Sequence, residues 1–252
     1  MIEWLKKKFY KQRAKKVSDY YNKWSSKFLE ITDTFQGFRT EDIAATHAYT
    51  IEKASLTGNM KILDAGCGVG GPAFYFASHL QSEIFPLTNS PVQVKIMDDR
   101  KKKESKSNIF PTLGDYHEIT SLFPPGTFDA VLFLESLGHS YFPEKVIDES
   151  FKALKPKGIL YIRDHFIVEG KTPEEKEQIK QLTNYADKTY VYNHTYLPRI
   201  EAALKNAGFR IKLIQKPKLQ FFNINPEFEN RFNIKSPNGY FIDTIEIQAT
   251  KP

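Results

Sequence analysis

Four glycines stand within six residues in the segment Gly66-Cys67-Gly68-Val69-Gly70-Gly71, which follows a short apolar run and precedes a helical pattern. Glycines are needed where a strand turns sharply into a helix and the backbone must approach a ligand closely, whichever nucleoside that ligand carries. The segment also satisfies the GxGxxG pattern of dinucleotide-binding proteins, which is weak evidence when it stands alone. It therefore predicts a nucleoside-binding turn and leaves the ligand open.

Two neighbouring features favour S-adenosylmethionine over a nicotinamide dinucleotide. Asp64 lies two residues before Gly66, where a carboxylate would attract the cationic end of a methionine moiety but repel a pyrophosphate. A nicotinamide site usually carries an acidic residue about 20 positions further on, at the ribose. The corresponding segment here is Leu87-Thr88-Asn89-Ser90, which has no acid. We therefore expect S-adenosylmethionine as cofactor and S-adenosylhomocysteine as product, with a nicotinamide dehydrogenase as a distant alternative.

The segment from Ile62 to Pro72 resembles the first motif of class I methyltransferases, in particular the sterol, tocopherol and isoprenoid C-methyltransferases and their cyclopropane-fatty-acid-synthase relatives. In that group the second strand commonly ends in Thr-x-Ser followed by Gln, and Thr88, Ser90 and Gln93 match this pattern. The resemblance implies ribose contacts from Thr88, Asn89 and Gln93, adenine contacts from Asp115 and Tyr116, and a contact of Tyr20 or Tyr21 with the methionine carboxylate. The full expected cofactor set is Tyr21, Asp64, Gly66, Cys67, Gly68, Thr88, Asn89, Ser90, Gln93, Asp115, Tyr116 and Glu135.

Some members of this set have a simpler structural explanation. Asp115 follows Gly114 and could be a turn residue, and Tyr21 could be a core aromatic. Cys67 is better explained as a small residue that fills the turn than as a nucleophile, because a turn packed against a cofactor leaves a thiol little access.

Methyl transfer from a sulfonium is an in-line displacement, so the protein must mainly align the reactants and exclude water. A base matters only if the acceptor loses a proton. Glu135 and His139 follow the fourth expected strand, at the edge where parallel sheets bind ligands. The resemblance implies that Glu135 faces the cofactor or a developing cation and that His139 accepts a proton, for which an unperturbed histidine is suited. Alternatively, Glu135 tethers a backbone amide and His139 is a satisfied polar residue.

Asp164, His165 and His194 have separations that match no metal-ligand motif, so no metal is expected.

The surrounding sequence alternates between strand-like and helix-like segments. Strands are expected at 61–64, 83–87, 108–113, 128–134 and 158–168, and helices at 2–30, 72–80, from 91 onward, 143–154 and 197–207. Two further strands at 210–222 and 240–250 would form an antiparallel carboxy-terminal pair. This pattern predicts an α/β fold with a Rossmann-like, seven-stranded class I methyltransferase sheet and helices on both faces.

We expect an amino-terminal helical cap at 1–50 and a methyltransferase domain at 51–252, with a lid insertion around 169–194. Acceptor specificity should come from the cap, from 34–47, from the insertion and from 222–240. The aromatic candidates are Tyr185, Tyr190, Tyr192, Phe221, Phe222, Phe228 and Phe232. They favour a small, apolar or aromatic acceptor methylated at carbon or oxygen.

The chain has 252 residues and a formal net charge of +6, concentrated in the lysines of 6–16 and in 100–103. Both clusters could simply be solvated helix faces, but the first could also contact an anionic membrane surface or an acidic partner. A basic surplus would also suit an anionic isoprenoid acceptor such as a prenyl diphosphate. No nucleic-acid partner is expected, because no recognised binding module accompanies the charge.

The single cysteine and the lack of an apolar signal or spanning segment predict a cytoplasmic protein, and the oligomeric state stays open. Two other functions compete with small-molecule methylation. One is methylation of a protein or RNA. The other is a cofactor-retaining protein that acts as a cyclase or a binding module.

Overall fold

The computed structural model describes residues 2–30, 32–34, 42–167, 169–218, 235–236, 239–240 and 242–252. The strands are β1 (Lys61–Ala65), β2 (Glu83–Thr88), β3 (Thr112–Leu113), β4 (Phe128–Leu134), β5 (Leu154–Ile167), β6 (Thr195–Tyr196), β7 (Arg210–Gln215), β8 (Lys235–Ser236), β9 (Gly239–Tyr240) and β10 (Ile242–Thr250). The helices are α1 (Ile2–Leu29), α2 (Ile43–Lys53), α3 (Gly71–His79), α4 (Pro91–Lys103), α5 (Ile119–Leu122), α6 (Pro143–Ala153), α7 (Pro173–Tyr190) and α8 (Leu197–Ala207), with 3-10 turns η2 (Tyr116–Glu118) and η3 (Leu137–His139).

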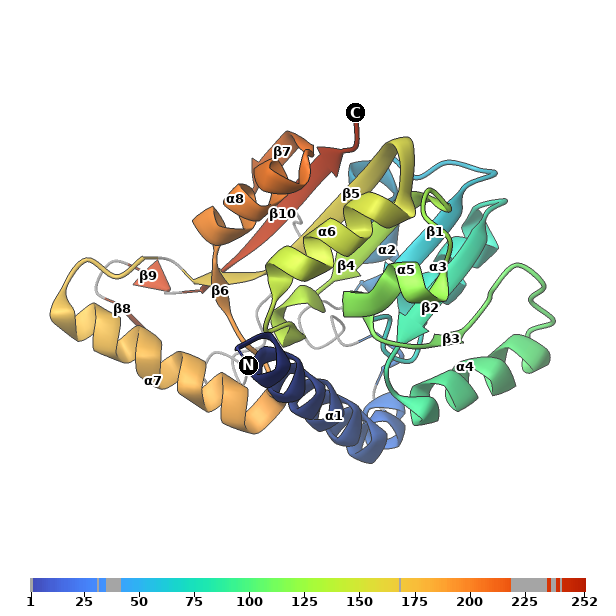
Figure 1. Ribbon diagram of the computed structural model, residues 1–252. Coiled ribbons are helices and arrows are strands. Elements are labelled where there is room, and N and C mark those ends of the chain that lie inside the picture. Colours follow the sequence, from blue (N-terminus) through green and yellow to red (C-terminus); the bar gives the residue numbers. More distant parts are fainter. Residues whose placement is uncertain are drawn as a thin grey trace.

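The central sheet has the order β3-β2-β1-β4-β5-β10-β7, with β6 paired to β5 (Figure 1). The first five strands of this order are parallel, whereas β10 runs antiparallel to both β5 and β7. The strand order reverses between β1 and β4. In open α/β sheets, ligands bind in the crevice beyond the carboxyl ends of the strands at such a reversal. The expected Rossmann-like sheet and its antiparallel pair are confirmed.

Apolar side chains pack helices onto both faces of this sheet. On one face, Phe74 and Phe76 of α3 and Met97 of α4 belong to the same buried cluster as Ile62 and Leu132. On the other, the buried cluster includes Val146 and Ile147 of α6 and Leu204 of α8, together with Leu63 and Phe133. Strand β4 is buried along nearly its whole length, as its continuous apolar sequence predicts for a central strand.

Local signals at the helix ends are also confirmed. Ser90 caps α4 by accepting a hydrogen bond from the backbone N–H of Gln93 at 3.2 Å, and Pro91 opens the helix. Gly208 ends α8 in the left-handed conformation, with φ of 96°.

Three strand boundaries are wrong by four residues or more, and the first is that of the expected strand 210–222, because β7 ends at Gln215. Only Thr112–Leu113 of the expected strand 108–113 forms regular pairs with β2, apart from an isolated bridge between Ile84 and Ile109. Pro111 lies between these contacts and has no N–H to donate to a ladder. Strand β5 begins at Leu154, four residues before the predicted start, because Leu154 pairs with Phe128 ahead of a register shift.

The expected insertion contains a helix that its polar sequence did not predict. Helix α7 begins with a capping box in which the Thr172 hydroxyl accepts from the N–H of Glu175 while the Glu175 carboxylate accepts from the N–H of Thr172. It ends at Tyr190, and the residue that caps it, Val191, has a φ of 56°, which is unusual for a β-branched residue. Helices α7 and α1 both lie along the lower edge of the sheet in Figure 1.

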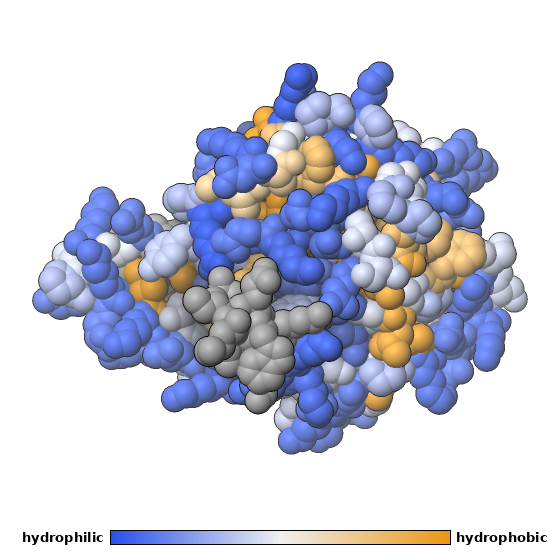
Figure 2. All heavy atoms as spheres, in the orientation of Figure 1, coloured by the Kyte–Doolittle hydropathy of each residue, from blue (hydrophilic) through white to orange (hydrophobic). Residues whose placement is uncertain are grey.

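The face drawn in Figure 2 is mostly hydrophilic, with small apolar areas. The exposed large apolar side chains are distributed over several elements and include Phe9, Leu113, Leu122 and Tyr196. None of the helices in the described ranges is long and apolar enough to cross a membrane.

Candidate active site

The glycine turn follows the carboxyl end of β1, and its backbone adopts conformations that favour glycine. Gly66, Gly68 and Gly70 have φ of 80°, 58° and 87°. A Cβ on Gly66 would stand 2.5 Å from the Cβ of Ser136, so a larger residue would displace the loop after β4. The N–H of Gly66 donates to the carbonyl of Leu87 at 2.8 Å. The turn is thus held between the ends of β2 and β4, where the strand order reverses.

Asp64 is a buried carboxylate at this turn, with only 1% of the residue exposed. One of its carboxylate oxygens, Oδ2, has no hydrogen-bond partner among the described residues. Burial raises the pKa of Asp64 to about 7, because a charged carboxylate loses its hydration there. A buried carboxylate of this kind is stabilised either by a neighbouring cation or by taking up a proton. The buried carboxylate of Asp64 therefore fits the ammonium group of S-adenosylmethionine, which would donate hydrogen bonds to it.

The residues expected around the ribose are brought together at the end of β2, where α1 covers them. Thr88 Oγ1 donates to Gln93 Oε1 at 2.5 Å, and Gln93 Nε2 donates to Ser25 Oγ of α1 at 3.0 Å. Ser90 Oγ donates to Asn22 Oδ1 at 2.6 Å.

Asn89 is held in the same way, since its Nδ2 donates to the carbonyl of Ala14 at 3.1 Å. Helix α1 therefore closes over the predicted ribose-binding edge.

Asp115 caps η2 and belongs to a chain of polar contacts. Its Oδ1 accepts from the backbone N–H of His117 at 2.9 Å and lies 2.7 Å from the Nδ1 of the same residue. The Nε2 of His117 lies 2.7 Å from Ser140 Oγ, whose hydroxyl can donate to it. Burial opposes ionisation, yet these His117 contacts keep the pKa of Asp115 below its usual value. His117 and Ser140 were not predicted, and the Asp-x-His spacing was the only local signal.

Tyr116 also lies beside the glycine turn. Its hydroxyl donates to the carbonyl of Ser136 at 3.1 Å, and Ser136 Oγ donates to the carbonyl of Ala65 at 2.6 Å.

His139, which lies after the end of β4, contacts both α1 and the residue that follows α7. Its Nδ1 lies 2.9 Å from the carbonyl of Val191, which can only accept, so Nδ1 carries the hydrogen. Its Nε2 lies 2.8 Å from the hydroxyl of Tyr21 and accepts from it. Burial lowers the pKa of His139 to about 4, aided by Arg13 and opposed by the Val191 carbonyl. The expectation of an unperturbed histidine is therefore wrong: His139 is neutral near pH 7 and a weak base.

Glu135 has a positive φ of 58°, which is uncommon outside glycine. Its Oε2 lies 3.1 Å from Nε2 of His165, and Nδ1 of His165 lies 3.1 Å from Thr244 Oγ1. Backbone conformations of this kind persist where the surrounding structure enforces them, often at functional sites.

Asp164 extends this cluster from β5. Its Oδ2 accepts from the N–H of Gly138 at 3.2 Å, and its Oδ1 accepts from the hydroxyl of Tyr192. The ring of Tyr192 lies 4.8 Å from that of His139, edge to face. Tyr192 is therefore the aromatic candidate that the structure places beside His139.

Two of the other aromatic candidates belong to the described residues. Tyr185 and Tyr190 are on α7, and Tyr185 is exposed. Phe221, Phe222, Phe228 and Phe232 lie outside the described residues, as does most of 222–240.

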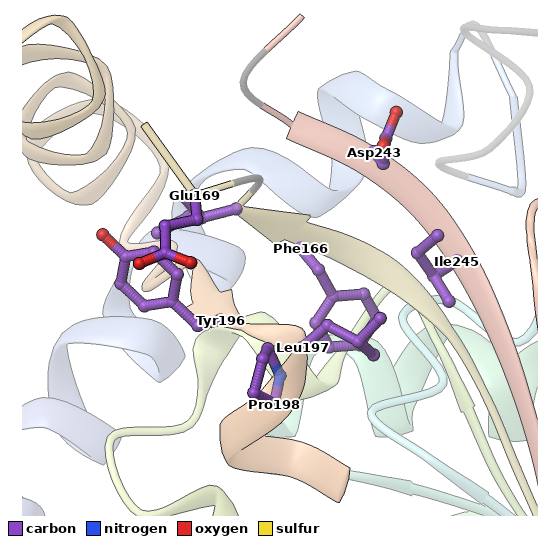
Figure 3. Close-up of a pocket in the computed structure, with 8 residues that line it drawn as sticks. Phe166, Glu169, Tyr196, Leu197, Pro198, Asp243 and Ile245 are labelled. Atoms are coloured by element: carbon purple, nitrogen blue, oxygen red, sulfur yellow. The ribbon is translucent and has the colours of Figure 1, made fainter. Parts of the chain in front are cut away.

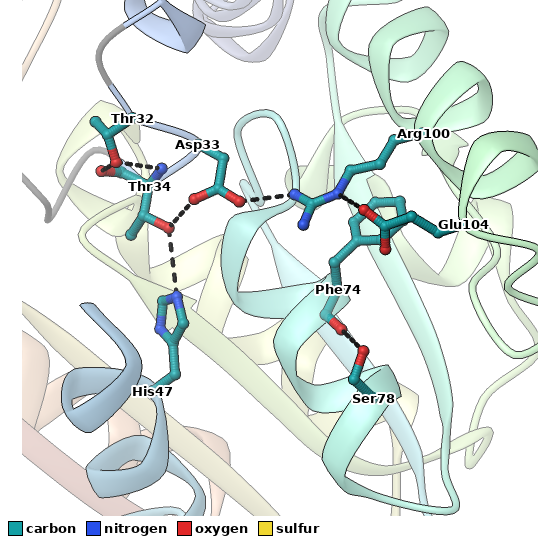
Figure 4. Close-up of polar contacts among 8 residues, drawn as sticks. All are labelled: Thr32, Asp33, Thr34, His47, Phe74, Ser78, Arg100 and Glu104. Carbon is teal, nitrogen blue, oxygen red and sulfur yellow. Dashed lines mark hydrogen bonds and ion pairs between the residues drawn. The ribbon is translucent and has the colours of Figure 1, made fainter. Parts of the chain in front are cut away.

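The short segment after α1 packs against the start of α3 (Figure 4). Thr34 Oγ1 lies 3.3 Å from Nε2 of His47, and Asp33 forms an ion pair with Arg100 at 2.7 Å. Thr34 Oγ1 would stand 2.1 Å from a Cβ on Gly71, so it packs directly on the glycine turn. Residues 35–41 of the expected specificity segment 34–47 lie outside the described residues.

Cys67 is buried, and its Sγ lies 3.8 Å from Sδ of Met97. Burial raises the pKa of its thiol, so it is a poor nucleophile. The part of the chain that the structure describes holds no group of three His, Cys, Asp or Glu side chains arranged to hold a metal ion.

Known proteins resemble this chain in sequence and in fold. Residues 56–224 match a methyltransferase domain family. The sterol 24-C-methyltransferase of Candida albicans is 30% identical over 200 residues, covering 78% of this chain and 52% of that enzyme. The sterol 24-C-methyltransferase of Clavispora lusitaniae is 29% identical over the same shares of both chains. The chain thus spans about half the length of the curated relatives it matches.

Two solved structures share the fold. The [4+2]-cyclase SpnF is 22% identical, with a TM-score of 0.67 over 83% of this chain and 80% of that chain. The geranyl diphosphate C-methyltransferase of Streptomyces coelicolor A3(2) is 14% identical, with a TM-score of 0.67 over 83% and 79%. The matching family covers most of the chain, including the glycine turn and the segment after β4. The chain therefore belongs to the methyltransferase domain family.

Proposed function

We propose that this protein transfers a methyl group from S-adenosylmethionine to a small, largely apolar acceptor of the lipid or isoprenoid type. The observation that carries the proposal is the isolated, buried carboxylate of Asp64 beside the glycine turn. A dinucleotide pyrophosphate would be repelled there, whereas the ammonium group of the methionine moiety would neutralise the carboxylate. The sterol C-methyltransferases among the relatives support the lipid class of acceptor.

When bound, the cofactor supplies an electrophilic methyl group on a sulfonium, and the chain's own residues orient the reactants. Asp64 binds the ammonium group, and Thr88 and Gln93 bind the ribose from the end of β2. Asp115, fixed by His117, accepts from the adenine amino group. Helices α1 and α7 cover this edge and exclude water, which favours an in-line displacement.

The basicity of His139 favours carbon over oxygen as the methylated atom. Methylation of an alkene carbon leaves a carbocation, which is so acidic that a base with a pKa of about 4 can remove its proton. The same base is too weak to remove the proton of a hydroxyl group efficiently. In the proposed step, the Tyr21 oxygen takes the proton from the carbocation as its own proton passes to Nε2 of His139, which ends as an imidazolium. Glu135, which contacts His165, and Asp164, which accepts from the N–H of Gly138 beside His139, would stabilise the developing positive charge.

A direct test uses S-adenosylmethionine labelled in its methyl group. Incubation with alkene-containing and hydroxyl-containing lipids should place the label on carbon of an alkene acceptor. Conversion of a substrate without incorporation of label would instead support the cyclase alternative. Label on a protein or RNA would support macromolecule methylation.

Two finer features belong to the same proposal. Helix α1 carries exposed Lys11, Lys15 and Lys16 together with Phe9, which is 53% exposed, and these suit peripheral contact with an anionic membrane. Co-sedimentation with phosphatidylserine vesicles, lost in 0.5 M salt to about the level of neutral vesicles, tests this contact. The buried, unpaired Cys67 suits a cytoplasmic location.

A further inference from the structure

A cavity of about 590 Å³ opens at the outer ends of β5 and β10, next to the start of α8 (Figure 3). Its lining is mainly apolar. The residues are Phe166, Ile167, Glu169, Tyr196, Leu197, Pro198, Asp243 and Ile245. The volume lies within the range of about 300–1,000 Å³ that is usual for small-molecule sites.

The cavity continues the cluster around His139. Successive side chains of a strand point to opposite faces, so Asp164 and Phe166 of β5 share a face. Asp164 accepts from the Tyr192 hydroxyl, and the Tyr192 ring contacts His139 at 4.8 Å. Two residues of strand span about 6.6 Å. The cavity therefore begins one side chain beyond the Tyr192 contact, at a distance that a single elongated acceptor could bridge.

The charges at both ends of this path are mainly negative. Glu135 and Asp164 lie at the inner end, where His165 pairs with Glu135. Glu169 and Asp243 lie at the outer end, where Lys216 pairs with Asp243 at 2.8 Å. None of the eight described lining residues carries a positive charge. A diphosphate would lose its hydration here and meet carboxylates, whereas a hydroxyl group could hydrogen-bond to Glu169 or Tyr196.

We propose that this cavity binds the apolar body of an uncharged acceptor, such as a prenyl or sterol-like alcohol, and discriminates against prenyl diphosphates. The inference rests on the proposed methyl transfer and narrows its acceptor class. It replaces the idea that the basic surplus of the chain serves an anionic isoprenoid, since the two basic clusters, 6–16 and 100–103, lie on α1 and α4 and none of their residues lines the cavity.

The test measures the binding of two probes with the same farnesyl group, farnesol and farnesyl diphosphate, to the 252-residue protein in the presence of S-adenosylhomocysteine. Calorimetry should give at least a tenfold tighter Kd for the alcohol. Leu197→Trp, which fills the cavity, should weaken alcohol binding at least tenfold. Ala202→Trp is the matched control, because Ala202 is exposed on the same helix and is not part of the lining, and it should bind farnesol normally.

Glu169→Lys should strengthen diphosphate binding at least fivefold, and this surface change keeps the proposal testable if Leu197→Trp does not fold. Equal or tighter binding of the diphosphate to the unmodified protein, binding of neither probe, or normal farnesol binding by folded Leu197→Trp would overturn the proposal. Affinity for S-adenosylmethionine is measured separately in each variant. If the unmodified protein does not bind S-adenosylmethionine, the proposed methyl transfer itself is refuted, and not only the proposed role of the cavity.

Discussion

The hydroxyl of Tyr21 on α1 lies 2.8 Å from Nε2 of His139, so the amino-terminal helix contributes directly to the polar cluster after β4. The resemblance implies that Tyr20 or Tyr21 contacts the methionine carboxylate. Because the Tyr21 hydroxyl is engaged with His139, we expect proton removal to be coupled to closure of α1.

Tyr21→Phe removes this hydroxyl while keeping the ring. We expect turnover to fall about tenfold or more and the Kd for S-adenosylmethionine to stay within about twofold, because the proposed proton path is broken while Asp64 and the ribose contacts remain. His139→Ala should have a similar effect. Because both residues serve one step, the double variant should be no slower than the slower single variant. Additive losses in single-turnover rates would show that the two act independently.

Asp64→Asn removes the buried carboxylate without changing its shape. Calorimetry should show loss of S-adenosylmethionine binding, since the ammonium group loses its counter-charge. In the unmodified protein the affinity should fall about tenfold per pH unit below pH 7, because the carboxylate becomes protonated.

The unfolding free energy of the cofactor-free protein should change with pH in the opposite sense to the affinity for S-adenosylmethionine. A folded-state pKa raised to about 7 means that stability is full below the usual carboxyl pKa and declines as the pH rises to about 7. Asp64→Asn should therefore be more stable than the unmodified protein at pH 8, by about 2–4 kcal/mol in urea unfolding. Equal stability at pH 8 would argue against an isolated carboxylate.

The pH dependence of turnover with saturating cofactor should report on His139. Its pKa is lowered to about 4, so the neutral form that accepts a proton persists down to that pH. We expect a flat rate between pH 5 and 8 and a decline only near pH 4, measured in short pH-jump assays. A decline in the rate of turnover centred near pH 6.5 would indicate that another histidine is the base.

Arg13 on α1 forms an ion pair with Asp187 on α7 and stacks over the Tyr141 ring at 4.2 Å. The Arg13 side chain is only 7% exposed, so Asp187→Asn leaves a buried guanidinium without its partner. We expect faster hydrogen exchange in both helices and a loss of about 1–2 kcal/mol in unfolding free energy. Asp19→Asn breaks the exposed pair with Lys15 on the same helix and should change neither quantity measurably.

Asp115 and His117 should determine the preference for adenine. The unmodified protein should bind S-adenosylmethionine at least about tenfold tighter than S-inosylmethionine, which lacks the adenine amino group. His117→Phe should reduce this ratio by freeing Asp115, and His117→Asn should partly restore it by supplying a donor. An unchanged ratio in both variants would show that Asp115 does not contact the adenine amino group.

The amino-acid sequence by itself determined the nucleoside-binding turn, the strand and helix alternation and the cofactor, because these depend on neighbouring residues. Positive-φ glycines between a buried strand and a helix, and Ser90-Pro91 at a helix start, act through local sterics and hydrogen bonding. Strand ends were less predictable, since the start of β5 depends on its pairing with Phe128.

Only the tertiary structure decided how the site is closed and how its side chains ionise. Tyr21 meets His139 across 118 positions of sequence, and His117 meets Ser140 across 23. The pKa values of Asp64 and His139 depend on burial by elements that are distant in the chain. Residue types fix which groups can react, but desolvation and long-range contacts fix their charge and orientation, and these arise only when the chain has packed.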